Sequence, residues 1–104
     1  MEKHGKILNL IRKEIALAPT DHVYLYGSRA RGDASPDSDW DILIVLDKPR
    51  VEQSDYDNIS YPITALGWSL GEMIIPIIYT RKEWEDASPS PFYKNVTSER
   101  IKII

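Results

Sequence analysis

Two aspartates separated by a single residue, Asp39 and Asp41, are the side chains of this sequence best suited to bind a metal ion. They stand at the start of the apolar run 42–46, which is typical of a β-strand. Side chains two residues apart in a strand point to the same face, and their Cα atoms lie roughly 7 Å apart. Carboxylates this close repel each other, and a hard divalent cation with oxygen ligands relieves the repulsion. The spacing therefore predicts that the two aspartates share one or two hard divalent cations, such as Mg²⁺ with a bound phosphate.

A turn of small residues, Gly27-Ser28, precedes the aspartates and is suited to approach a phosphate group. It follows the short apolar run 23–26, which predicts a strand. Glycine lets the backbone turn sharply and come close to a ligand. A helix that begins at Ser28 or Arg29 would direct free backbone N–H groups at an anion, and Arg29 and Arg31 carry fork-shaped donors for phosphate oxygens. The segment therefore predicts an anion site beside the metal site.

These elements form an ordered pattern, in which Gly27 and Ser28 are followed by ten residues and then by Asp39 and Asp41 inside an apolar strand. The pattern resembles the nucleotidyltransferase superfamily related to DNA polymerase beta. It is most similar to the small stand-alone members, the minimal nucleotidyltransferases, whose loop often reads Gly-Ser-x-Ala-Arg-Gly before Ser-Asp-x-Asp. The motif covers residues 27–41, and the order of elements extends the resemblance over roughly the whole chain. The resemblance implies an α/β (α+β) fold in which helices flank a small mixed sheet.

By this resemblance, Gly27 and Ser28 bind the phosphates of a nucleotide, Arg31 is a further candidate for the same role, and Asp39 and Asp41 are catalytic ligands of Mg²⁺. The implied reaction is in-line attack of an acceptor hydroxyl on the α-phosphate of a nucleoside triphosphate, with ATP expected and pyrophosphate leaving. Minimal nucleotidyltransferases of this kind often act beside a small helical partner of the HEPN type in toxin–antitoxin pairs. The implied acceptor is a hydroxyl of a protein, such as a tyrosine of that partner, or of a small molecule.

The family pattern includes a third catalytic carboxylate on a later, neighbouring strand, and its place in this sequence is ambiguous. The apolar run 72–79 contains a single acid, Glu72, at its start. Asp47 has the same strand parity as Asp39, but it lies about 20 Å along the strand from Asp41 and is too distant. Glu72 is therefore the candidate third catalytic residue. The alternative is that Glu72 is a solvated acid at a strand entry.

Two functions from different classes are consistent with these residues. The first is an enzyme that transfers a nucleoside monophosphate from a Mg²⁺-bound triphosphate. The second is a catalytically weak nucleotide-binding or protein-interaction module that regulates a partner by contact. A carboxylate within about 5 Å of both Asp39 and Asp41 would favour the enzyme, because shared metals require that closeness. Its absence would favour the module.

Composition limits the classes of protein and partner. The 104 residues predict one domain over residues 1–104. The net charge of −3 argues against a broad nucleic-acid surface, which is normally basic. The sequence has no cysteine, no apolar run near the roughly 18 residues of a membrane helix, and no signal-peptide core at its start. We therefore expect a cytoplasmic protein without a membrane segment, and its oligomeric state, including a homo-oligomer, stays open.

The remaining pattern predicts the elements that position the motif. The run 42–46 is apolar throughout, so we expect a central strand covered on both faces. Pro76 cannot donate to a ladder, which favours an edge or a bulge for its strand. In chain order, the expected elements are a helix over 7–15 ending before Pro19, strands over 23–26 and 42–46, a helix between Ser54 and Ser69 that Pro62 kinks or begins, a strand over 73–79, a helical turn over 81–86 and a terminal helix over 92–104.

Overall fold

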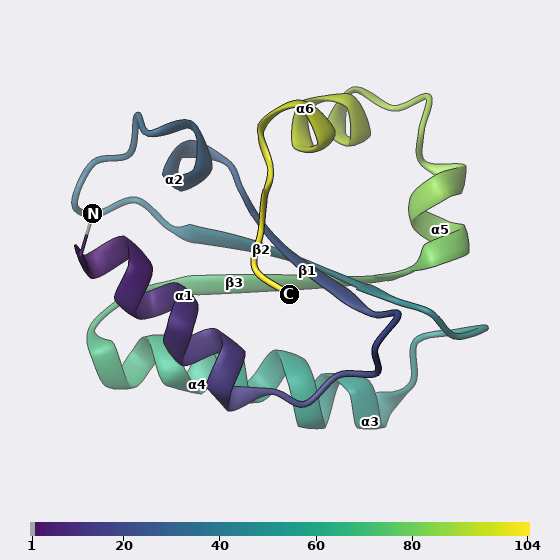
Figure 1. The fold of residues 1–104 in the computed structure, drawn as a ribbon, viewed down its shortest axis with the longest axis horizontal. Coiled ribbons are helices and arrows are strands. Elements are labelled where there is room, and N and C mark those ends of the chain that lie inside the picture. Colours follow the sequence, from purple (N-terminus) through teal and green to yellow (C-terminus); the bar gives the residue numbers. More distant parts are fainter. Residues whose placement is uncertain (1) are drawn as a thin grey trace.

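The computed structural model describes residues 2–104, with side chains from Gly5 onward. Figure 1 shows strands crossing the middle of the molecule with helices on both sides. Within this described part of the chain, no helix combines the length and the apolar character needed to span a bilayer. In chain order, the elements are α1 (Glu2–Glu14), β1 (His22–Tyr26), α2 (Ser28–Arg31), β2 (Trp40–Leu46), α3 (Gln53–Asp55), the π-helical segment η1 (Tyr56–Ser60), α4 (Tyr61–Leu70), β3 (Ile74–Thr80), α5 (Arg81–Asp86), α6 (Pro91–Glu99) and β4 (Ile101–Lys102).

The strands form one mixed sheet in the order β3-β2-β1-β4. β1 is antiparallel to both β2 and β4, whereas β2 is parallel to β3. β2 is the central strand that its continuous apolar run predicts, and all residues from Ile42 to Leu46 are buried. β3 lies at an edge, as expected for a strand that contains Pro76. The predicted fold, a small mixed sheet flanked by helices, is confirmed.

Alternation along β2 divides the core into two layers, one on each face of the sheet. On the first face, α1 and α4 cover a cluster that includes Trp40, Ile42 and Ile44. On the second face, α5 and α6 cover a smaller cluster that includes Leu43 and Val45. Figure 1 shows these two helix pairs on opposite sides of the strands. Asp41 has the parity of Leu43, so its carboxylate belongs to the face of α5 and α6.

The helix predicted between Ser54 and Ser69 is interrupted by a wider turn. α3 passes directly into the π-helical η1, and α4 follows with Pro62 in its first turn. Proline has no backbone N–H and is tolerated at this position, where no intrahelical donor is needed. Pro62 therefore lies in the first turn of α4, directly after the π-helical segment, and Ser60 and Tyr61 keep the backbone helical across this junction.

The predicted terminal helix over residues 92–104 is too long. α6 ends at Glu99, Arg100 takes an extended conformation with φ −64° and ψ 147°, and β4 pairs with Tyr24 and Leu25 of β1. The last residues are rich in isoleucine, whose branched side chain favours strands. Pairing also covers the free edge of β1 and buries Ile103 in the first layer. Long-range edge pairing thus overrides the local helical pattern.

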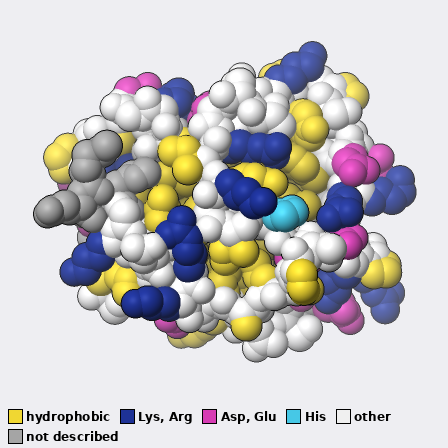
Figure 2. All heavy atoms as spheres, viewed as in Figure 1, with side chains coloured by type: hydrophobic (Ala, Val, Ile, Leu, Met, Phe, Trp, Pro, Cys, Tyr) yellow, Lys and Arg dark blue, Asp and Glu magenta, His cyan; other side chains and the backbone are white. Residues whose placement is uncertain are grey.

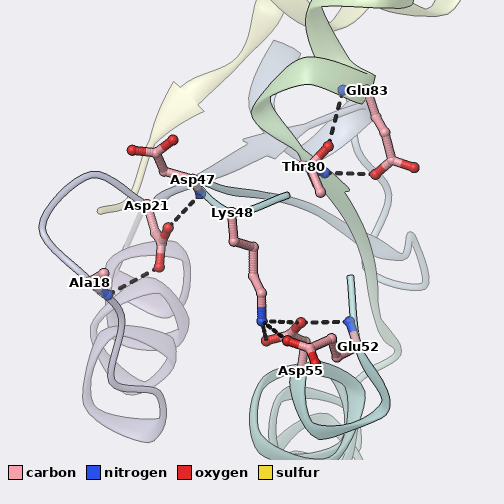
Figure 3. Close-up of polar contacts among 8 residues, drawn as sticks. All are labelled: Ala18, Asp21, Asp47, Lys48, Glu52, Asp55, Thr80 and Glu83. Atoms are coloured by element: carbon pink, nitrogen blue, oxygen red, sulfur yellow. Dashed lines mark hydrogen bonds and ion pairs between the residues drawn. The ribbon is translucent and has the colours of Figure 1, made fainter. Parts of the chain in front are cut away.

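Polar contacts fasten the end of the sheet that lies away from the predicted motif (Figure 3). The Asp21 carboxylate accepts hydrogen bonds from the backbone N–H of Ala18 at 3.0 Å and of Asp47 at 2.7 Å. Lys48 Nζ forms ion pairs with Glu52 at 2.8 Å and Asp55 at 2.9 Å. These contacts join the segment before β1 to the segment after β2, and the latter to α3. The candidate site lies at the opposite end of these two strands.

Candidate functional site

The turn after β1 has the backbone geometry that glycine allows. Gly27 has φ 75° and ψ −160°, and α2 begins at Ser28 as predicted. Gly32 ends α2 in the left-handed region with φ 85°, and its N–H donates to Ser28 O at 3.0 Å. Both positive φ values are conformations that other residues rarely adopt. The small residues around α2 therefore allow a single helical turn between two sharp changes of chain direction.

Arg29 anchors the loop that leads to the aspartates. Its Nη2 donates to Pro36 O at 3.2 Å and to Ser38 O at 2.9 Å. Its guanidinium also lies over the Trp40 ring, 4.3 Å from the ring centroid. These contacts direct Arg29 into the loop and away from the phosphate-binding role that the sequence suggested for it. They also hold the loop so that the chain enters β2 beside α2.

The structure brings Gly27 into contact with Asp41. Asp41 pairs with Tyr26 in the antiparallel register of β1 and β2, which places it beside the turn. A Cβ atom added to Gly27 would overlap the Asp41 carboxylate. Glycine is therefore required here both for the positive φ and for the space that Asp41 occupies. Asp39 is exposed one residue before β2 begins.

The electrostatics of the pair are those of a site with excess negative charge. Burial raises the pKa of the Asp41 carboxyl, and the charges of Asp39 and Glu99 raise it further, whereas Arg31 lowers it. Burial, followed by the charge of Asp41, raises the pKa of the neighbouring Tyr26 to about 12. Carboxylates with incomplete charge compensation are the oxygen donors that Mg²⁺ takes together with substrate phosphates. The residues present therefore fit a phosphate-bound Mg²⁺ ion.

The third predicted acid, Glu72, does not join the aspartates. Its Oε1 accepts a hydrogen bond from Trp40 Nε1 at 2.8 Å and lies 3.8 Å from Arg29 Nη2. Trp40 points to the opposite face of the sheet from Asp41. Glu72 therefore supports the loop and the first core layer, because it lies in the turn between α4 and β3, where its N–H donates to Gly67 O at 2.9 Å, and its side chain contacts Trp40. Across the described residues, no three acidic or histidine side chains form a group that could hold a metal ion.

An apolar residue lies beside Asp41 on the neighbouring strand. The parallel register of β2 and β3 pairs Asp41 with Ile75. Paired residues on adjacent strands project to the same face, and the strands lie about 4.8 Å apart. Ile75 is 38 % exposed. A carboxylate on β3 would have to stand at this position to meet the two aspartates, and the chain has isoleucine there.

Glu99, at the end of α6, is a site residue that the sequence did not reveal. Its Oε2 accepts hydrogen bonds from Gly27 N at 2.5 Å and from Arg31 Nη1 at 3.0 Å. Its side chain is only 13 % exposed. A single glutamate in a predicted terminal helix carries no sequence signal that would place it at a turn 72 positions earlier. The fold therefore adds a carboxylate next to the predicted phosphate-binding groups.

Basic side chains are prominent on the face that carries β4, as Figure 2 shows. Two of the arginines near β4 are engaged by the chain itself. Arg12 Nε donates to Ile103 O at 2.8 Å, and the Arg100 guanidinium lies 4.3 Å from the centroid of the Tyr24 ring. These two cations help to hold β4 against β1 and α1.

Comparison with known proteins agrees with the geometry of the turn and the aspartates. Residues 6–103 match the family model described as nucleotidyltransferase domain. A search of curated proteins gave no match.

Two solved structures are similar to the fold. One is described as the crystal structure of the toxin-antitoxin with AMP-PNP; it has a TM-score of 0.60 and 19% identity, and the match covers 97% of this chain and 72% of that one. The other is a protein from Sulfolobus solfataricus described as a nucleotidyltransferase, with a TM-score of 0.54 and 21% identity; the match covers 96% of this chain and 76% of that one. At these identities the likeness shows the fold.

Proposed function

The chain belongs to the nucleotidyltransferase domain family, and we propose that it binds a Mg²⁺-bound nucleoside triphosphate, with ATP expected, and transfers the nucleoside monophosphate to a hydroxyl. The observation that carries this proposal is the contact between Gly27 and Asp41. It supports the proposal because the turn proposed to bind phosphates lies next to a carboxylate proposed to bind the metal ion, as transfer from a metal-bound triphosphate requires.

Each residue of the site has a role in this proposal. Gly27 and Ser28 receive the phosphates at the turn, and Arg31 adds a guanidinium beside them. Asp39 and Asp41 would hold Mg²⁺. The bound ion would neutralise phosphate charge and align the attacking and leaving oxygens. The burial of Asp41 supports this assignment, because a partly desolvated carboxylate interacts more strongly with a cation than one in bulk water.

The acceptor in this proposal is a hydroxyl of a protein or a small molecule, and the favoured candidate is a helical partner of the HEPN type. The support is the fold likeness to a protein described as a toxin-antitoxin bound to AMP-PNP. The site also leaves room for an acceptor, since Asp39 and Ile75 are both exposed. In this arrangement the chain would modify its partner and so regulate it.

A second function, a nucleotide-binding module that regulates a partner by contact, is favoured by one specific observation. Ile75 stands where a third carboxylate on β3 would meet Asp41. In the reaction, that carboxylate would help to hold the metal ion that activates the attacking hydroxyl. A site with two carboxylates would retain Mg²⁺–nucleotide binding and transfer slowly or not at all.

The test uses the intact protein with labelled ATP, Mg²⁺ and the product of the adjacent gene. We expect label on the partner, and we expect Asp39→Asn with Asp41→Asn to abolish both labelling and Mg²⁺-dependent nucleotide binding. The control is Asp57→Asn, because Asp57 is an exposed acid of η1. Labelling that survives the double substitution would refute the metal site. Wild-type protein that binds Mg²⁺–ATP without transferring label would establish the binding module.

A further inference from the structure

We propose that Glu99 occupies the place of a nucleotide phosphate in the nucleotide-free protein, so that the chain's own carboxylate competes with the nucleotide. The inference rests on the proposed function, because it takes Gly27 and Arg31 as phosphate-binding groups. Those are the two groups that Glu99 Oε2 contacts, at 2.5 Å from Gly27 N and 3.0 Å from Arg31 Nη1. A triphosphate cannot bind these donors until the carboxylate leaves.

Glu99 and a phosphate present the same chemistry to the turn. Each offers an anionic oxygen that accepts from a backbone N–H and a guanidinium at once. Such charge-assisted hydrogen bonds are shorter and stronger than neutral ones. The single oxygen Oε2 accepts both bonds. The carboxylate therefore acts as an internal substitute for one phosphate oxygen.

The backbone on both sides of Glu99 is held in place. Val96, one helical turn earlier, is 1% exposed in the second core layer. Arg100 N donates to Val96 O at 2.9 Å, and β4 begins at the next residue. Release of Gly27 and Arg31 therefore requires rotation of the Glu99 side chain and leaves α6 and β4 in position.

Charge makes the competition selective for a ligand that carries its own cation. Asp39, Asp41 and Glu99 contribute negative charge around the turn, and the effect of Arg31 opposes it at Asp41. A metal-free triphosphate adds further negative charge to this group. A Mg²⁺-bound triphosphate brings a cation for the aspartates, while its phosphate takes over Arg31 from Glu99.

The experiment measures the affinity of the intact protein for Mg²⁺–AMP-PNP and, separately, for Mg²⁺ with inorganic triphosphate. Glu99→Ala removes both contacts. Glu99→Gln keeps an oxygen for Gly27 but removes one of two carboxylate charges on Arg31, whose Nε still pairs with Asp33 at 3.1 Å. We expect Glu99→Ala to tighten binding about tenfold, the factor for one charge-assisted hydrogen bond. Glu99→Gln should give an intermediate value. The control Glu85→Gln, at an exposed position of α5, should leave the affinity unchanged.

The amide resonance of Gly27 reports the contact directly. It should shift in ligand-free Glu99→Gln, and in wild-type protein it should move when the triphosphate binds. Equal or weaker nucleotide binding by both Glu99 variants would overturn the inference and leave the proposed function standing. Tighter binding of inorganic triphosphate by these variants, with no nucleotide binding, would support the inference and refute the proposed function. If neither ligand binds any variant, both are refuted.

Discussion

Asp41 of β2 and Ile75 of β3 are direct partners in the parallel register, so an exposed isoleucine stands beside the more buried carboxylate of the site. On the opposite side, Asp41 is paired with Tyr26 of β1. Asp41, one of the two proposed metal ligands, is therefore flanked by an apolar and an aromatic side chain on the sheet. The chain therefore has the two aspartates proposed to bind Mg²⁺–nucleotide, but β3 has isoleucine where a carboxylate would assist the proposed transfer.

Ile75→Asp should supply the carboxylate that β3 lacks. The new side chain would project to the face of Asp41 from a strand about 4.8 Å away, and an added charged ligand tightens divalent binding. We expect Mg²⁺ affinity to rise about tenfold, or about 1.4 kcal/mol, and label transfer from ATP to increase. Isothermal titration with Mg²⁺ and nucleotide measures the first effect. Ile75→Asn is the matched control, because it has the same shape without the charge, and an equal gain in Ile75→Asn would contradict the explanation.

Gly27→Ala should destabilise the protein more than Gly32→Ala does. Both glycines have positive φ, at 75° and 85°, but a Cβ atom on Gly27 would overlap the Asp41 carboxylate, whereas one on Gly32 would meet nothing within 4 Å. We expect a loss of about 1 kcal/mol in the free energy of unfolding for Gly32→Ala and of about 2 kcal/mol or more for Gly27→Ala. Urea denaturation measures both. Equal losses of stability would contradict a steric overlap between the new Cβ atom at position 27 and the Asp41 carboxylate.

Glu72→Ala should affect stability and spare nucleotide binding. Glu72 accepts the indole N–H of Trp40, which is only 1% exposed, and a buried donor without its partner costs about 1–3 kcal/mol. Glu72→Gln keeps an acceptor at this position and should lose less. Because Glu72 lies on the Trp40 side of the sheet, the affinity for Mg²⁺–nucleotide should stay within twofold, or about 0.4 kcal/mol. A tenfold loss of affinity for Mg²⁺–nucleotide in a folded Glu72→Gln protein would indicate that Glu72 takes part in metal binding.

Asp41→Asn should stabilise the metal-free protein at neutral pH. Burial, together with the charges of Asp39 and Glu99, raises the pKa of Asp41 in the folded state. The folded protein then binds more protons than the unfolded chain between the two pKa values, so the Asp41 contribution to stability falls as pH rises through that window. The advantage of Asp41→Asn should be full above the folded pKa of Asp41 and disappear below about pH 4. Thermal melts of both proteins from pH 3 to 7 in EDTA measure this stability difference. If Asp41→Asn instead became less stable than wild type as pH rises, the Asp41 carboxylate would be stabilised in the folded state by positive charge or hydrogen bonds.

Local rules were sufficient to predict the segment from β1 to β2. A strand, a glycine turn, one turn of helix and a second strand each depend on residues that are neighbours in sequence. The same rules predicted that Asp39 and Asp41 follow the turn, and the structure adds that Asp41 reaches Gly27. The family resemblance rested on this segment, and the match over residues 6–103 confirms it.

Features that depend on contacts between residues distant in sequence could not be predicted from local sequence patterns. The position of Glu72 depends on the turn that leads from α4 into β3, where its N–H donates to Gly67 O at 2.9 Å, and on the pairing of β3 with β2. The strand β4 depends on the free edge of β1, which lies about 80 residues earlier in the chain. Glu99 reaches the site because β4 fixes the end of α6, so one wrong prediction about the terminal residues also concealed this contact.

The bond between Gly27 and Glu99 spans 72 positions, and this separation orders events during translation. Ribosomes add about 5–20 residues per second, so Glu99 is synthesised several seconds after the turn that it contacts. Until then, the nascent chain contains the turn and the two aspartates but neither Glu99 nor β4, which pairs with β1. The contact proposed to block the turn therefore cannot form until the end of α6 has been synthesised.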